Sequence, residues 1–303
     1  MITVSVVTGS SNVTLKQKIE PSELIKLWRA ELDLDISPEL RGVDEIALYE
    51  CNDTGVQFFT PATISGSEAL YQQLEKFPWY YLSHKWEYDV AVRDLTSASR
   101  VLEIGCGRGD FRQRLVARGM KATGLEINPS AAAAARAQNL DVISAADLFS
   151  YAATNRGNFD AVCAFQVLEH FSDPRAFFDA ALVLLKPRAR LLVGVPNRKS
   201  FLQYIDNPLD LPPHHMLRWS AENFGRLDGF FPLDVERIRF EPLSAYHIPG
   251  YLLAVRNRLA RLGLLSREWF VRPLLFSLRT LLRLGLRRFC TGQTLYVVLR
   301  ART

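Results

Sequence analysis

Three glycines alternate with other residues in the segment VLEIGCGRGD, residues 101–110. The apolar run at its start is typical of a buried strand, Gly105, Gly107 and Gly109 follow, and residues 111–119 have a helical pattern. Because glycine has no Cβ, a chain with this spacing can turn tightly and approach a ligand closely. The N–H groups at the start of the next helix can bind an anionic group. The pattern predicts a strand, a glycine-rich turn and a helix that hold a cofactor; the alternative is an ordinary tight turn.

The spacing of the glycines separates two kinds of cofactor site. A dinucleotide site has the pattern G-x-G-x-x-G, but Asp110 occupies the position of its third glycine. The segment instead reads G-x-G-x-G with an acidic residue ahead of it, and this resembles the first motif of class I S-adenosylmethionine-dependent methyltransferases. A NAD-type oxidoreductase remains the alternative. The resemblance implies S-adenosylmethionine as the cofactor, bound here by Glu103, Gly105, Cys106, Gly107 and Gly109.

Two acidic residues follow the next predicted strands. Glu126 closes the strand over 121–127, 21 residues after Gly105, where a carboxylate can accept the hydroxyls of a ribose. The resemblance gives Glu126 that role, beside Ile127; the alternative is a solvated acid at a strand end. A third strand is expected over 140–144. In the resembled family an acid after it contacts the adenine amino group, which points to Asp147 beside Leu148, although Asp147 could also cap a helix.

A second motif is FDAVCAFQVLEH, residues 159–170. It predicts a buried strand that turns into a helix carrying Leu168, Glu169 and His170. In form and in distance from the glycines it resembles the fourth motif of small-molecule methyltransferases. The resemblance implies that the backbone at Phe165 and Gln166 lies beside the methionine part of the cofactor.

Aromatic and imidazole side chains complete the candidate site. Residues 78–88 are dense in aromatics, and Tyr80 and Tyr81 could face a sulfonium cation, or could simply pack a helix against the sheet. His170, His214 and His215 fall on expected pocket loops. A neutral imidazole can remove the proton of a hydroxyl acceptor, so we expect a base among them, His170 or His215 first. A structural hydrogen bond is the alternative for each.

The resemblance implies an α/β fold: a Rossmann-like, seven-stranded, mostly parallel sheet in the order 3-2-1-4-5-7-6, with helices on both faces. We expect an accessory module over 1–66 and a methyltransferase domain over 67–303. The pair of strands around Cys51 resembles an N-terminal module that often carries a zinc ribbon. Thr54 stands where the second cysteine would be, so no metal site is expected there.

Residues 245–290 interrupt the methyltransferase pattern before its last strand. Arg272, Arg279, Arg283 and Arg287 are spaced to share one helical face, with apolar residues opposite. One interpretation is a membrane-surface helix or a platform for an anionic lipid-linked glycan. The other, which we prefer, is an insertion packed on the domain with a solvated arginine stripe. Pro273 should start or break a helix, so one continuous rod is not expected.

Composition limits the class of protein. The chain has 303 residues, 48% hydrophobic and 23% charged, and no apolar run long enough to span a bilayer. The start lacks the pattern of a signal peptide, and four scattered cysteines favour a reduced, cytoplasmic location, with possible membrane association through 245–290.

The net charge of the chain is +5, and residues 251–290 alone contain nine arginines and one glutamate. The basic charge is therefore confined to one segment and does not indicate a nucleic-acid-binding surface over the whole protein. No Asn-Pro-Pro-Tyr type sequence follows the fourth strand. We therefore expect methyl transfer to a hydroxyl of a small-molecule or glycan acceptor. A non-catalytic protein that retains the fold and binds membranes or partners is the other alternative.

Overall fold

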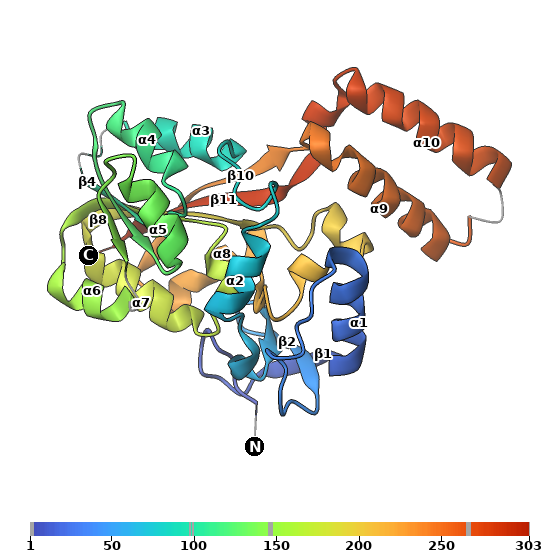
Figure 1. Ribbon diagram of the computed structural model, residues 1–303, viewed down its shortest axis with the longest axis horizontal. Coiled ribbons are helices and arrows are strands. Elements are labelled where there is room, and N and C mark those ends of the chain that lie inside the picture. The colour runs from blue at the N-terminus through green and yellow to red at the C-terminus, as the bar shows by residue number, and fades with distance from the viewer. Residues whose placement is uncertain (1–2, 97, 99, 145–147, 265–267, 303) are drawn as a thin grey trace.

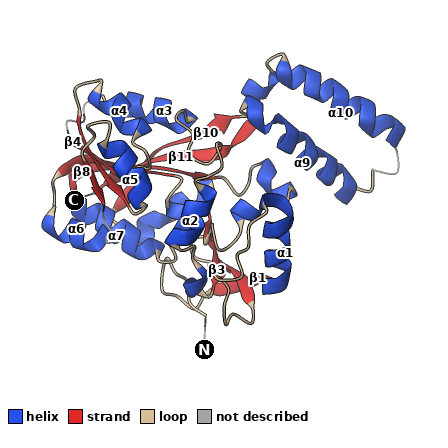
Figure 2. Ribbon diagram, in the orientation of Figure 1, coloured by secondary structure: helices blue, strands red, loops and turns tan. Residues whose placement is uncertain are grey.

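The computed structural model describes residues 3–96, 98, 100–144, 148–264 and 268–302, with only the backbone for 268–270. A seven-stranded sheet forms its centre (Figure 2). Five neighbouring strands are parallel, and the penultimate strand in space is antiparallel to both of its neighbours. In spatial order the strands are β6 (Val142–Ser144), β5 (Lys121–Glu126), β4 (Arg100–Ile104), β7 (Phe159–Phe165), β8 (Leu185–Pro196), β11 (Thr291–Ala301) and β10 (Leu233–Pro242). This order confirms the expected topology, with β4 as the first strand.

Helices cover both faces of this sheet (Figure 1). On one side, α3 and α4 pack against the residues of β4, β7 and β8 that point toward them, including Val101 and Leu192. On the other side, α7 packs against the alternate residues, including Leu102 and Leu191. Successive side chains of a strand point to opposite faces, so a strand buried on both sides must be apolar throughout. The helices of the two layers are α3 (Trp86–Asp94), α4 (Asp110–Val116), α5 (Pro129–Arg136), α6 (Leu148–Thr154) and α7 (Pro174–Leu184).

The N-terminal residues form a second, four-stranded antiparallel sheet whose last strand comes from far along the chain. The order is β1 (Val13–Ile19), β2 (Ile46–Cys51), β3 (Gln57–Thr60) and β9 (Leu217–Arg218). Beside it lie α1 (Pro21–Leu32) and α2 (Glu68–Leu74). Trp28 of α1 is fully buried and donates from Nε1 to the carbonyl of Pro212 at 3.2 Å. The two sheets share one hydrophobic core, so the second sheet fixes the loop that contains residues 212–216. The division at residue 66 stays a prediction.

A helical hairpin projects from the sheet between β10 and β11 (Figure 1). It consists of α9 (Ile248–Arg261) and α10 (Glu268–Arg283). Pro273 lies inside α10, so the expectation that it would start or break a helix was wrong for this helix. Val271 and Leu282 of this helix are buried. Among the described helices, none is long and apolar enough to cross a membrane.

A further short helix, α8, spans Ala221–Phe224. Two shorter elements differ from expectation. Leu168–His170 forms a single 3-10 turn instead of a helix. Arg287 lies in a 3-10 turn after α10, so it does not continue the arginine face of that helix. Each difference occurs where the chain leaves an element for a loop, and local periodicity is weak there. All four cysteines are free thiols in this structure.

Substitution of Gly109 by alanine should destabilise the fold by about 1–3 kcal/mol more than Gly119→Ala. Both glycines have a positive φ, +87° and +78°, so both variants strain the backbone. A Cβ at Gly109 would lie 2.3 Å from Leu140 Cδ1, whereas one at Gly119 would meet no atom of the described residues within 4 Å. Urea denaturation of the two variants measures the difference. Equal losses of stability would contradict the close packing at Gly109.

Candidate functional site

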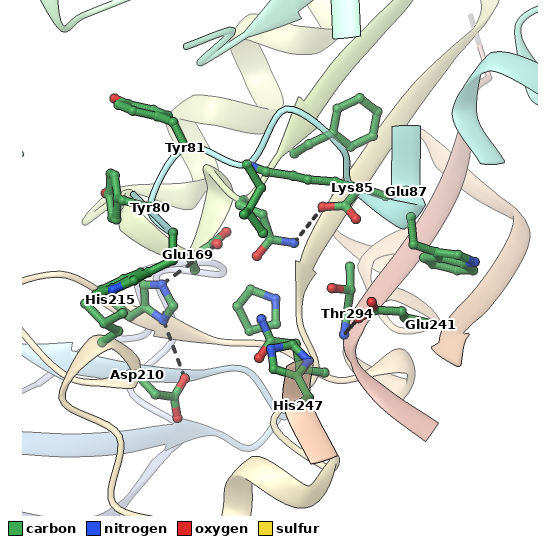
Figure 3. Close-up of a pocket in the computed structure, with 18 of the residues that line it drawn as sticks. Tyr80, Tyr81, Lys85, Glu87, Glu169, Asp210, His215, Glu241, His247 and Thr294 are labelled. Atoms are coloured by element: carbon green, nitrogen blue, oxygen red, sulfur yellow. Dashed lines mark hydrogen bonds and ion pairs between the residues drawn. The ribbon is translucent and has the colours of Figure 1, made fainter. Parts of the chain in front are cut away.

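A cavity of about 680 Å³ lies beyond the carboxyl ends of the parallel strands. Gly105 follows β4, Gln166 follows β7 and Pro196 ends β8, and all three line it. Ligands of open α/β sheets bind outside the carboxyl ends of the strands, where the strand order reverses. The lining also includes residues 79–82 and 85–88 ahead of β4, His247 just before α9, and Gly250 of α9 (Figure 3). The cavity is therefore enclosed by parts of the chain far apart in sequence.

The glycine turn has the conformation that its residue types require. Gly105, Gly107 and Gly109 have φ values of +69°, +52° and +87°. A Cβ at Gly105 would lie 2.3 Å from Cγ2 of Val167, which is too close for any other residue. Gly105, Cys106 and Gly107 line the cavity, whereas Gly109 packs on Leu140 behind it. The first two glycines thus shape the cavity wall, and the third serves packing.

Glu126 binds the glycine turn from behind. Its Oε2 accepts the N–H of Gly107 at 2.7 Å and its Oε1 accepts the N–H of Asn128 at 2.8 Å. Burial raises the pKa of this carboxyl, and the backbone N–H groups oppose the rise. The side chain is only 6% exposed and does not line the cavity itself. The carboxylate that the sequence assigned to a ribose therefore lies directly behind Gly107.

Tyr81 covers the same place from the cavity side. Its ring would lie 3.3 Å from a Cβ on Gly107, and the guanidinium of Arg108 lies over the ring. Glu75, just after α2, accepts hydrogen bonds from Arg108, Asn128 and Ser130. A cofactor that reached Glu126 would have to displace the Tyr81 ring. The segment from Glu75 to Tyr81 is thus a cover over the part of the site that the sequence assigned to the nucleoside.

The remaining predicted cofactor residues divide into three groups. Phe165 and Gln166 line the cavity, and Gln166 donates from Nε2 to Glu87 at 3.1 Å. Glu103 is buried beneath the turn, where its Oε2 has no partner among the described residues, and burial raises its pKa. Ile127, exposed, and Leu148, buried, lie outside the cavity lining. Asp147 lies outside the described residues.

The three histidines that the sequence selected form one cluster in the cavity wall, although 44 residues separate His170 from His214. The ring centroids of His170, His214 and His215 are 4.5–5.0 Å apart. His170 Nδ1 lies 2.6 Å from the carbonyl oxygen of His214. His214 Nδ1 lies 2.9 Å from the carbonyl oxygen of Leu209. A carbonyl oxygen only accepts, so in both rings Nδ1 carries the hydrogen.

Two carboxylates flank the third imidazole (Figure 3). His215 Nδ1 lies 3.5 Å from Asp210 Oδ1, and its Nε2 lies 3.9 Å from Glu169 Oε1. Burial lowers the pKa of His170 to about 4, although the carbonyls of His214 and Gln166 oppose the shift. Burial also lowers the pKa of His214 and His215, and it raises the pKa of Glu169 to about 8. The imidazoles are therefore neutral at pH 7, and each ring keeps one nitrogen without a hydrogen that can act as an acceptor.

Several cavity residues escaped the sequence interpretation. Glu169 lies inside the second motif, but the motif itself indicated a catalytic role only for its neighbour His170. Asp210 stands one residue before the Leu-Pro-Pro-His-His segment, a position that could have drawn attention to it. Glu87, Glu241 and His247 come from helices and strands whose pattern indicates packing only. No local signal could have placed these three in the cavity.

The described residues fit S-adenosylmethionine. The turn at Gly105 and Gly107 lines the cavity with backbone, and the N–H of Gly107 is bound by Glu126. Phe165 at the end of β7 and Gln166 after it also line the cavity. The aromatic ring of Tyr81 also lines the cavity, and an aromatic face can stabilise a sulfonium cation. These roles stay predictions for each residue.

Comparisons with known proteins agree with this description. Residues 79–228 match a family described as methyltransferase domain. A ubiquinone biosynthesis O-methyltransferase of Xanthomonas axonopodis pv. citri is 34% identical over 117 residues, which are 36% of this chain and 48% of that protein. The same named enzyme of Xylella fastidiosa is 34% identical over 114 residues, 36% of this chain and 46% of that protein. The match thus spans about half the length of these curated relatives.

Solved structures with a similar fold include a SAM-dependent methyltransferase from Archaeoglobus fulgidus, with 19% identity and a TM-score of 0.46 over 70% of this chain and 94% of that one. Another, from Thermotoga maritima, has 19% identity and a TM-score of 0.49 over 78% and 97% of the two chains.

Replacement of Glu126 by alanine should weaken binding of S-adenosylmethionine about 10- to 100-fold, because hydrogen bonds to a charged group contribute about 1.5–3 kcal/mol. Isothermal calorimetry measures the change. Glu45→Ala is the control, since Glu45 is an exposed acid that pairs with Lys18 on the second sheet. Gly107→Arg should abolish binding by filling the cavity at the turn. Wild-type affinity in both site variants would refute the assignment.

Proposed function

We propose that the chain transfers a methyl group from S-adenosylmethionine to a hydroxyl of a small-molecule or glycan acceptor. The match of residues 79–228 to the methyltransferase-domain family supports the reaction class. One observation carries the proposal: a single cavity is lined both by the glycine turn and by the cluster of His170, His214 and His215. The names of the curated relatives, O-methyltransferases of ubiquinone biosynthesis, support a hydroxyl as the acceptor group. The family match also favours methyl transfer over the NAD-type alternative.

Each part of the cavity has a separate task in this proposal. Gly105, Gly107 and Glu126 hold the nucleoside side of the cofactor, and Phe165 and Gln166 hold its methionine side. When bound, the cofactor supplies a methyl group on a sulfonium that is already activated, so the protein mainly aligns the two reactants and excludes water.

The acceptor hydroxyl must lose its proton, and we assign that step to the histidine cluster with its buried neighbour Glu169. Neutral imidazoles can take up a proton, and the fixed Nδ1–H of His170 and of His214 directs each lone pair to Nε2. His214 Nε2 lies 3.0 Å from the hydroxyl of Tyr80, which can donate to it. Among the described residues no hydrogen-bond donor occupies Nε2 of His170 or His215, so these two rings are the candidate bases.

The acceptor surroundings are mostly apolar and aromatic. Trp79, Leu82, Trp86, Phe201 and Ile205 line the cavity together with the histidines. Such a wall favours an acceptor with an apolar or aromatic body over a bare sugar. A phenol is thus the first acceptor class to examine.

The test is a methyl-transfer screen with labelled S-adenosylmethionine against phenols, sugar nucleotides and lipid-linked glycans. His170→Ala should lower kcat about 10²- to 10⁴-fold, the usual contribution of proton transfer, while calorimetry shows unchanged cofactor affinity. His84→Ala is the matched control, because His84 is exposed on the surface and does not line the cavity. Transfer to an amine but not to a hydroxyl would contradict the acceptor class. An unchanged kcat in His170→Ala would contradict the role of the cluster.

We also propose that the hairpin of α9 and α10 contacts an anionic membrane surface. Arg272, Phe276, Arg279 and Arg283 are spaced to share one face of α10, and all four are exposed. Phe276 is 72% exposed, and Phe289 beyond the helix is 88% exposed. Aromatic side chains among arginines suit the interface of a bilayer with anionic headgroups. An apolar acceptor dissolved in that bilayer would then be near the cavity.

Flotation with vesicles measures this contact. The full chain should float with phosphatidylglycerol vesicles and not with phosphatidylcholine vesicles. Arg279→Ala with Arg283→Ala should weaken binding about 30-fold, since each arginine near such a surface contributes about 1 kcal/mol. Arg118→Ala is the control, because Arg118 is an exposed arginine near the end of α4. Equal flotation of the double variant and the wild type would refute the contact.

A further inference from the structure

We propose that His170, His214 and His215 bind one divalent transition-metal ion, of the zinc class, on the acceptor side of the cavity. A ring nitrogen from each of the three lies within 4.8 Å of those of the other two. Among the described residues no other such cluster of histidine, cysteine and acidic groups occurs. Three imidazoles, often joined by a carboxylate or water, are a usual ligand set for zinc.

The second nitrogen of each ring faces an oxygen acceptor. The partners of Nδ1 are the carbonyl of His214 for His170, the carbonyl of Leu209 for His214 and the carboxylate of Asp210 for His215. Metal-binding histidines almost always donate their other N–H to a carbonyl or carboxylate, which fixes the ring and makes the free nitrogen more basic. This arrangement leaves Nε2 of each ring as the candidate ligand atom.

Glu169 supplies an independent observation. The side chain is 1% exposed, its Oε1 lies 3.9 Å from His215 Nε2, and neither oxygen has a hydrogen-bond partner among the described residues. A buried polar group without a partner costs free energy. A metal ion held by the three imidazoles would lie beside this carboxyl group and give it a partner. Figure 3 shows Glu169 and Asp210 on either side of His215.

Binding requires a small local closure. Zinc–nitrogen bonds are about 2.0–2.1 Å, so nitrogens as much as 4.8 Å apart would have to approach each other by roughly 1–1.5 Å. The hydroxyl of Tyr80, now 3.0 Å from His214 Nε2, would have to release that nitrogen. Both changes involve side chains on loops, whereas the strands beneath them can stay in place.

The role of the ion rests on the proposed function, although binding itself does not. A fourth position of the ion would be open to an acceptor oxygen, and a bound cation lowers the pKa of a hydroxyl. The O–H bond would break there, with the electron pair left on oxygen and the proton released to solvent. The histidines would then act on the acceptor through the ion instead of as free bases.

The test uses the full chain with Cys290→Ser, because Cys290 is the only cysteine not classed as buried and could bind metal by itself. After dialysis against a chelator, Co²⁺ is added and its visible absorption is followed. We expect one ion per chain with a tetrahedral spectrum, displacement by Zn²⁺, and a rise in Tm with either ion. His170→Ala and His215→Ala should each lose saturable binding and the rise in Tm, whereas His84→Ala should keep both.

Calorimetry with S-adenosylmethionine separates this proposal from the proposed function. Each histidine variant should bind the cofactor as the wild type does, which also shows that it is folded. Absence of saturable Co²⁺ binding by the wild type, or binding that persists in His170→Ala and His215→Ala, would overturn the metal site while leaving the methyltransferase assignment intact. Loss of cofactor binding by the metal-free wild type would instead count against the proposed function.

Discussion

The hydrogen bond from the Gly107 N–H to the Glu126 carboxylate joins the two halves of the cofactor region. It links the turn after β4 to the end of β5, and it exists because Gly107 can adopt a φ of +52°. Leu125, one residue earlier, accepts the N–H groups of Gly105 and Cys106 through its carbonyl. Three consecutive backbone donors are thus held by neighbouring residues of one parallel strand. A turn anchored in this way presents its other surface to the cavity without further support.

The cover formed by Glu75 and Tyr81 depends on the same anchor. Glu75 accepts from Asn128, whose backbone N–H in turn binds Glu126, so the cover and the carboxylate are connected through one residue. Displacement of Tyr81 would expose the region of Gly107 and Glu126 together. Entry of a cofactor and movement of the segment that contains the aromatic residues are therefore coupled in this structure. The same segment carries Tyr80 to the histidine cluster, so both sides of the cavity share a wall.

The second sheet has an indirect but specific effect on the acceptor side. β9 pairs with β3, and Met216 donates its N–H to the carbonyl of Glu169. Trp28 fixes Pro212 from the opposite side. These contacts hold His214 and His215 against His170, so the N-terminal residues shape a site to which they contribute no ligand. The N-terminal sheet thus positions the loop that carries His214 and His215.

The sequence by itself predicted the glycine turn and the position of Glu126 at the end of the next strand, because apolar runs, glycine spacing and strand ends can be identified within a short window. The order of the strands followed only from the resemblance to a known family. The sequence also indicated the three histidines as candidate bases, because imidazole can accept a proton and all three lie on expected loops. The tertiary structure alone decided that these histidines meet, that Glu169 and Asp210 flank them, that Tyr81 covers Gly107, and that Pro273 lies within a helix. Such outcomes depend on packing between segments tens to hundreds of residues apart, and no periodicity within any one segment records that packing.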